Sequence, residues 1–131
     1  MNVYIDHLAI YVDQLEEVRD FYVKYFGAVV NDRYNNPRTG LQTFFLSFGG
    51  RTRLEIMSRP DTRPGDKSDG MTGYTHIAFV LSSREAVDRL TNRLAADGVS
   101  IAGAPRETGD HYYESVVLDP EGNRIELIAA P

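Results

Sequence analysis

The chain repeats one order of structural elements twice. Residues 3–12 and 72–81 alternate between large aliphatic and smaller or polar residues, which predicts strands with one buried face. Each is followed by a segment of helical periodicity and then by three short strand-like runs. The helical stripes are Leu15, Val18, Tyr22, Tyr25 and Phe26, and then Val87, Leu90 and Leu94; the runs are 28–35, 42–48 and 52–58, and then 99–106, 112–118 and 123–129. The sequence therefore predicts two βαβββ modules.

The expected helix ends are marked by residues with known capping roles. Asp13 with Glu16, and Ser82 with Glu85, have the spacing of a capping box. Gly27 and Gly98 are placed to end the two helices.

The expected fold class is α+β, with two βαβββ modules in tandem forming a curved mixed sheet. We place the first module at 1–58, a linker at 59–71 and the second module at 72–131, all within a single domain. The linker is rich in Pro, Asp and Gly and has few large apolar residues.

Each module carries a His in its first strand and a Glu in its last. Glu55 lies between Leu54 and Ile56, and Glu126 lies between Ile125 and Leu127. Since the aliphatic neighbours must face the helix-covered core, each Glu faces the other side of its sheet. His7 and His76 also lie opposite large aliphatic residues. If the two polar faces meet, His7, Glu55, His76 and Glu126 converge.

Two imidazoles and two carboxylates are suitable ligands for a divalent ion such as Zn, Ni, Co, Mn or Fe. The chain has no Cys, so thiolate ligands and disulfides are excluded. A single strand His is more commonly a structural residue, but four such residues at repeated positions favour a metal site. A bound ion would polarise a carbonyl oxygen and stabilise a developing enolate.

The charge and the chain's start limit the remaining possibilities. The formal net charge of −5 argues against nucleic acid as a partner, because phosphate contacts need clustered Lys and Arg. We find no signal peptide and no apolar run of membrane length, so no membrane association and a cytoplasmic location are expected. His111 is expected at the surface, with a role in a substrate lid as the alternative.

Five segments resemble the vicinal oxygen chelate superfamily, in its glyoxalase and bleomycin-resistance branch. They are DHLAI at 6–10, RDFYVKYFG at 19–27, LEI at 54–56, YTHIAF at 74–79 and DPEGNRIELI at 119–128. The resemblance covers essentially the whole chain and implies the superfamily's fold, a small-molecule substrate and a homodimer. In glyoxalase I, the family pattern places His, Glu, His and Glu at the four positions named above.

The resemblance also implies a reaction, that of a lactoylglutathione lyase-like enzyme. A hemithioacetal held by one divalent ion, with Zn or Ni favoured and Mn, Co or Fe possible, loses a proton from carbon and is reprotonated at the next carbon. Glu126, and with it Glu55, would act as the base.

This sequence departs from the bacterial glyoxalase I pattern at two positions. Tyr11 replaces an Arg that meets a glutathione carboxylate, and Arg59 replaces an Asn. Arg106, in the connection that leads to 112–118, is a candidate substitute for the carboxylate contact. Tyr11, Phe45 and Tyr113 either line an aromatic substrate pocket or pack as an ordinary sheet face. The use of glutathione is therefore open.

Other functions compatible with the resemblance are a metal-dependent epimerase, an Fe(II) ring-cleaving dioxygenase, a fosfomycin-type thiol transferase and a non-catalytic drug- or metabolite-binding protein. The dioxygenase and the transferase need two His and one carboxylate, which makes Glu55 a surplus ligand. The binding protein does not need the four ligands, all of which are present here.

Overall fold

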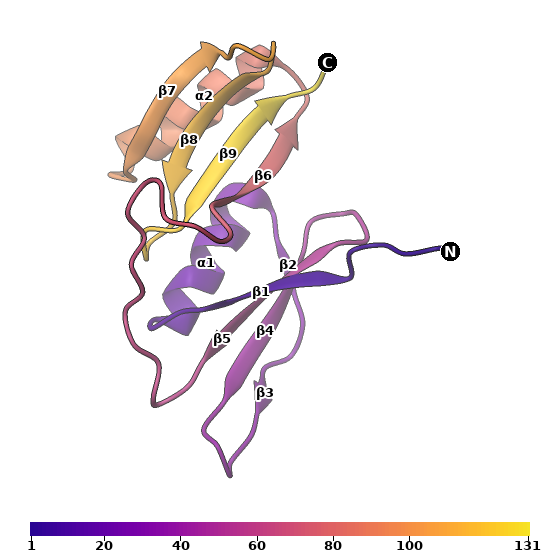
Figure 1. The fold of residues 1–131 in the computed structure, drawn as a ribbon, viewed down its shortest axis with the longest axis vertical. Helices are drawn as coiled ribbons and strands as arrows, with labels where there is room; N and C mark the ends of the chain where they lie inside the picture. Colours follow the sequence, from indigo (N-terminus) through magenta and orange to yellow (C-terminus); the bar gives the residue numbers. More distant parts are fainter. The chain divides into compact units, whose positions relative to one another are not determined.

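The computed structural model describes residues 1–131. The chain divides into two compact units, Met1–Gly65 and Asp66–Pro131, and the boundary lies within the segment 59–71. Each unit has one helix and its own sheet (Figure 1).

The first unit contains two-residue strands as well as longer ones. Its elements are β1 (His7–Tyr11), α1 (Leu15–Phe26), β2 (Val29–Val30), β3 (Tyr34–Asn35), β4 (Gln42–Ser47) and β5 (Arg53–Ser58). The strand order is β1-β5-β4-β2, and β3 pairs with β4 beside this path. Strands β1 and β5 are parallel, and the other pairs are antiparallel.

The second unit follows the same plan. Its elements are β6 (His76–Leu81), α2 (Arg84–Ala96), β7 (Ile101–Glu107), β8 (Tyr113–Leu118) and β9 (Arg124–Ala129). The strand order is β6-β9-β8-β7, with β6 and β9 parallel and the other pairs antiparallel. The predicted α+β class with tandem modules and mixed sheets is confirmed.

The core of each unit lies between its helix and one face of its sheet. In the first unit, α1 contacts β4 and β5, and the residues buried there are Leu15, Val18, Phe21, Tyr22, Phe44, Leu46, Leu54 and Ile56. In the second, α2 contacts all four strands, and the buried residues are Val87, Thr91, Leu94, Ser115, Val117, Ile125 and Leu127. The two buried hydroxyls, of Thr91 and Ser115, lie 2.8 Å apart and share a hydrogen bond, as burial of polar groups requires.

The run 28–35, predicted as one strand, is two short strands. Between them, the Asn31 side chain accepts a hydrogen bond from the Phe45 backbone N–H at 2.8 Å. This side-chain oxygen takes the place of a backbone carbonyl, so the regular ladder is interrupted. The strands predicted at 3–12 and 72–81 begin only at His7 and His76.

The helix N-caps lie one residue beyond the predicted positions. The N-cap of α1 is Gln14, not Asp13, and its side chain makes no capping hydrogen bond. The N-cap of α2 is Ser83, not Ser82, and its hydroxyl accepts from the Ala86 N–H at 3.0 Å. At the other end of α1, Gly27 has the predicted left-handed conformation, with φ 65°.

Neither α1 nor α2 is long and apolar enough to cross a membrane.

Candidate metal centre

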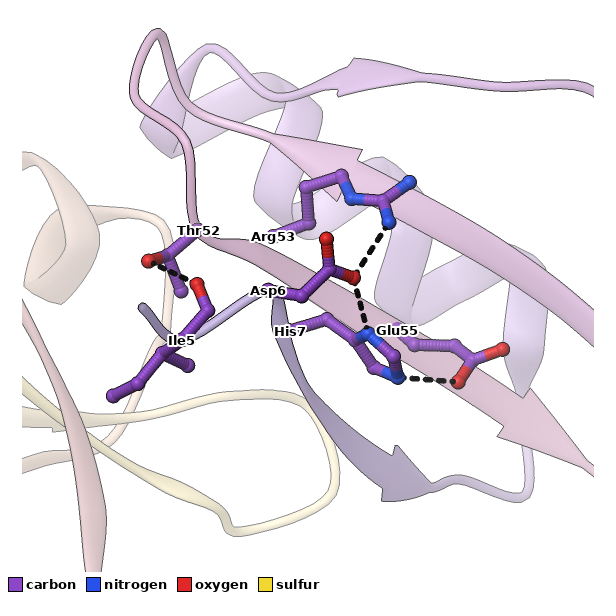
Figure 2. Close-up of polar contacts among 6 residues, drawn as sticks. All are labelled: Ile5, Asp6, His7, Thr52, Arg53 and Glu55. Atoms are coloured by element: carbon purple, nitrogen blue, oxygen red, sulfur yellow. Dashed lines mark hydrogen bonds and ion pairs between the residues drawn. The ribbon is translucent and has the colours of Figure 1, made fainter. Parts of the chain in front are cut away.

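His7 and Glu55 are diagonal neighbours on the face of the first sheet that α1 leaves free. In the parallel pair β1–β5, His7 lies opposite Arg53 and Ala9 lies opposite Glu55. Side chains two residues apart along a strand share a face, so the His7 ring reaches Glu55. The His7 Nε2 atom is 3.6 Å from the Glu55 Oε1 atom (Figure 2).

The second unit repeats this arrangement with His76 and Glu126. In the parallel pair β6–β9, His76 lies opposite Arg124 and Ala78 lies opposite Glu126. The His76 Nε2 atom is 3.2 Å from the Glu126 Oε1 atom. The equal register in both units shows that the repeat seen in the sequence extends to the placement of both side-chain pairs.

The other ring nitrogen of each His is already engaged. The His7 Nδ1 atom lies 2.7 Å from the Asp6 carboxylate, and the His76 Nδ1 atom lies 2.7 Å from the Thr75 hydroxyl. Metal-binding histidines commonly donate their second ring N–H to such a partner, which leaves the first nitrogen's lone pair for the ion. Both Nε2 atoms face the Glu of their pair.

The distances in the two pairs suit a shared ion. Two bonds of about 2.1 Å that meet at a tetrahedral or octahedral angle hold their donor atoms about 3.0–3.4 Å apart. The observed distances of 3.2 and 3.6 Å are close to this range, so the residues fit a divalent metal. No group of three or more His, Cys, Asp and Glu residues suited to a metal occurs in the structure. The meeting of all four ligands remains a prediction.

Aromatic and cationic side chains surround the first pair. The Phe45 ring meets the His7 ring edge to face, with 5.2 Å between centroids, and the Arg53 guanidinium lies 4.2 Å from the Phe45 centroid. Tyr11 shares the face of His7, and the Arg59 guanidinium lies 5.0 Å from its ring. The predicted residues Tyr11, Phe45 and Arg59 therefore lie on or beside the polar face of the first sheet.

The second pair has a carboxyl neighbour that the sequence reasoning missed. On β8, Val116 lies opposite Glu126, and Glu114 is two residues along on the same face. Burial and then the charge of Glu126 raise the pKa of the Glu114 carboxyl above its usual value. Strand alternation could have predicted this neighbour. Ser115 faces the core, so the adjacent Glu114 faces the same side of the sheet as Glu126.

Arg106 lies in β7, not in the connection that follows it, and it pairs with Glu114 across the β7–β8 ladder. Its Nη1 donates to the Glu114 backbone carbonyl at 3.2 Å, and its Nη2 lies 3.9 Å from the Glu114 carboxylate. This places a cation beside the carboxyl neighbour of Glu126.

Tyr113 and His111 are placed away from the second pair. The Tyr113 hydroxyl donates to Asp88 on α2, a bond that raises the pKa of the Tyr113 phenol. Glu126 faces away from α2, so we leave Tyr113 out of the proposed site. His111 is exposed as predicted, and its Nδ1 lies 3.6 Å from Glu107.

The structure contains two βαβββ units with mixed sheets, and each has a His–Glu pair on its free sheet face. This is the arrangement that the resemblance implies for the vicinal oxygen chelate fold. The model of the Glyoxalase/Bleomycin resistance protein/Dioxygenase superfamily matches residues 4–127, and the chain belongs to this family.

Individual relatives agree with this assignment. The chain is 31% identical to the uncharacterized protein PA2024 of Pseudomonas aeruginosa, over 97% of this chain and 89% of that one. It is 28% identical to lactoylglutathione lyase of Escherichia coli O157:H7, over 93% of this chain and 89% of the enzyme. The glyoxylase/bleomycin resistance protein/dioxygenase domain from Frankia sp. EAN1pec has the same fold, with a TM-score of 0.82, 16% identity and full coverage of both chains.

Proposed function

We propose that this protein is a divalent-metal-dependent lyase or isomerase of the glyoxalase I type, which moves a proton between two carbons next to a carbonyl or hemithioacetal oxygen. The observation that carries the proposal is the pair of His–Glu contacts in equal register, each with the His Nε2 atom turned to the carboxylate. The similarity to lactoylglutathione lyase supports the same reaction class.

In this proposal His7, Glu55, His76 and Glu126 hold one ion, with Zn or Ni as the preferred metal. The bound ion supplies Lewis-acid polarisation of a substrate oxygen. The protein's own carboxylates carry the proton. Glu126 accepts the proton that the substrate carbon loses and returns it to the neighbouring carbon, and Glu55 is the second candidate for this role.

The residues beside the first pair are suited to a substrate with an apolar part and an anionic part. Tyr11 and Phe45 present ring faces and edges, and Arg59 lies against Tyr11. Arg106 offers a second cation in the other unit. These groups can bind a carboxylate-bearing thiol, and glutathione is the first such thiol to test.

The proposed active form is a homodimer, as the resemblance implies. Light scattering on the purified protein measures this directly, and we expect twice the mass of one chain.

The reaction test uses the purified chain, stripped of metal and reloaded separately with Zn²⁺ and Ni²⁺. We expect the metal-loaded protein, but not the stripped protein, to convert methylglyoxal and glutathione to a thioester, followed by its ultraviolet absorption. Metal-loaded protein that forms no thioester with any thiol, and exchanges no proton next to the carbonyl of the substrates offered, would rule out the proposed function.

A further inference from the structure

Asp6 is fixed in place before β1 begins. Its backbone carbonyl accepts from the Arg53 N–H at 3.0 Å, and its carboxylate accepts from Arg53 Nη2 at 2.8 Å. Next to it, the Thr52 hydroxyl donates to the Ile5 carbonyl at 2.9 Å. Thr52, just before β5, and Arg53, its first residue, therefore hold the backbone of this segment and the Asp6 side chain (Figure 2).

The same Asp6 oxygen that binds Arg53 also meets His7. Oδ2 lies 2.7 Å from the His7 Nδ1 atom, and Figure 2 shows the chain of contacts from Arg53 through Asp6 and His7 to Glu55. A carboxylate cannot donate, so the proton in this contact belongs to Nδ1. The Glu55 carboxylate lies 3.6 Å from Nε2, beyond hydrogen-bond distance, so the shorter contact with Asp6 decides the tautomer and leaves the lone pair of neutral His7 on Nε2.

The second unit has a weaker version of this contact. Thr75 takes the place of Asp6, and its hydroxyl both donates and accepts, so it does not select one tautomer of His76. A hydrogen bond to a carboxylate is also roughly twice as strong as a neutral one. The two histidines are therefore held unequally.

We propose that Asp6, anchored by Arg53, is a positioning residue that fixes His7 in its Nδ1–H tautomer and makes His7 the more firmly oriented histidine of the metal site. The metal part of this inference rests on the proposed function, whereas the tautomer is a property of the metal-free protein. The arrangement also distinguishes Arg53, which anchors Asp6, from Arg124, which occupies the same register position beside His76.

The first test reads the tautomer without any metal. Long-range proton–nitrogen correlation spectra resolve the ring nitrogens of the 3 His residues, and His111→Gln removes one set of signals. In metal-free protein above the pH at which His is protonated, we expect His7 as the Nδ1–H form. Asp6→Ala should convert it to a mixture of tautomers, whereas Asp6→Asn, which keeps an acceptor oxygen, should retain the Nδ1–H form. A His7 tautomer unchanged in Asp6→Ala would overturn the inference.

The second test measures affinity for Zn²⁺ alone by competition with a chromophoric chelator. Loss of such a partner of a metal-binding His lowers affinity by about 10–100-fold, and we expect a loss of this size in Asp6→Ala. The loss should be smaller in Asp6→Asn, Arg53→Gln and Thr75→Ala, and absent in the control Asp20→Ala, whose carboxylate pairs with Arg19 on α1.

The outcomes separate the two proposals. Wild-type protein that binds no Zn²⁺ would contradict the proposed function, while the spectra would still decide the role of Asp6. If wild-type protein binds Zn²⁺, two results would contradict the positioning role. One is a Zn²⁺ affinity of Asp6→Ala equal to that of wild type, and the other is a Zn²⁺ affinity of Thr75→Ala as low as that of Asp6→Ala. If Asp6→Ala does not fold, the Zn²⁺ affinities of Arg53→Gln and Asp6→Asn test the inference instead. Affinities equal to wild type in both variants would overturn it, and losses in both would support it.

Discussion

Glu55 and Glu126 occupy equivalent positions but have different neighbours. Phe45 lies opposite Glu55 on β4, and Val116 lies opposite Glu126 on β8. Glu126 also has a second carboxyl group, that of Glu114, as an electrostatic neighbour. In the proposed function Glu126 is the base, and the second carboxyl group beside it distinguishes its surroundings from those of Glu55.

Glu126→Gln should therefore lower turnover by about 10²–10⁴-fold, the usual contribution of a positioned general base. Gln keeps an oxygen that can bind metal, so we expect metal to remain bound at saturating Zn²⁺. Steady-state kinetics with parallel metal analysis measure both quantities. The exposed Glu17→Gln on α1 is the control. A metal-loaded Glu126→Gln variant with wild-type turnover would show that another group is the base.

Glu114 should make the stability of the metal-free protein depend on pH. Its pKa in the folded state is raised above 4.5, the ordinary value of a Glu side chain, mainly by burial. The folded state therefore favours protonated Glu114, and this stability is present below the unfolded pKa and lost as pH rises through the folded pKa.

Glu114→Gln, which stays neutral, should raise the free energy of unfolding at neutral pH and leave it nearly unchanged below pH 4.5. Urea unfolding of the stripped protein at the two pH values measures the difference. An equal gain at both values would mean that the effect does not come from the charge of Glu114.

The start of α2 gives a prediction at the scale of a single element. Ser83 provides the only N-cap side-chain bond of the two helices, to the Ala86 N–H. Ser83→Ala should lower the free energy of unfolding by about 1 kcal/mol, as loss of an N-cap typically does. The neighbouring exposed Ser82→Ala should stay within about 0.5 kcal/mol of wild type. If chemical denaturation shows a larger loss of unfolding free energy for Ser82→Ala than for Ser83→Ala, the N-cap would be Ser82.

The elements themselves could be predicted because strand alternation and helix periodicity are repeated in both halves. Their boundaries could not, since Asp13 and Gln14, or Ser82 and Ser83, are adjacent polar residues that only three-dimensional geometry distinguishes. The break between β2 and β3 depends on the Asn31 side chain, which meets a residue distant in sequence.

The candidate ligands could also be predicted, but not all of their partners. A residue next to His7 within a strand would face the core, so alternation gives no reason to connect Asp6 with the site. Because β1 begins only at His7, the Asp6 side chain is free of that alternation and reaches the ring. Thr75 stands in the same position before β6.

For the whole molecule, the proposed function requires each unit to supply two ligands and all four to bind one ion. Metal should therefore stabilise the folded protein, by about 4 kcal/mol at a free concentration 1,000 times the dissociation constant. His7→Ala and His76→Ala should each abolish most of this gain, although they lie in different units. Thermal unfolding with and without Zn²⁺ measures the gain. If each variant kept half of it, the units would bind metal independently.

X-ray absorption spectroscopy of the protein loaded with one equivalent of Zn²⁺ tests the shared site most directly, because imidazole rings give a scattering pattern that can be counted. We expect two imidazoles and carboxylate oxygens around each ion, with bonds of about 2.0–2.2 Å. A spectrum with one imidazole per ion, or with none, would show that His7 and His76 do not bind the same metal.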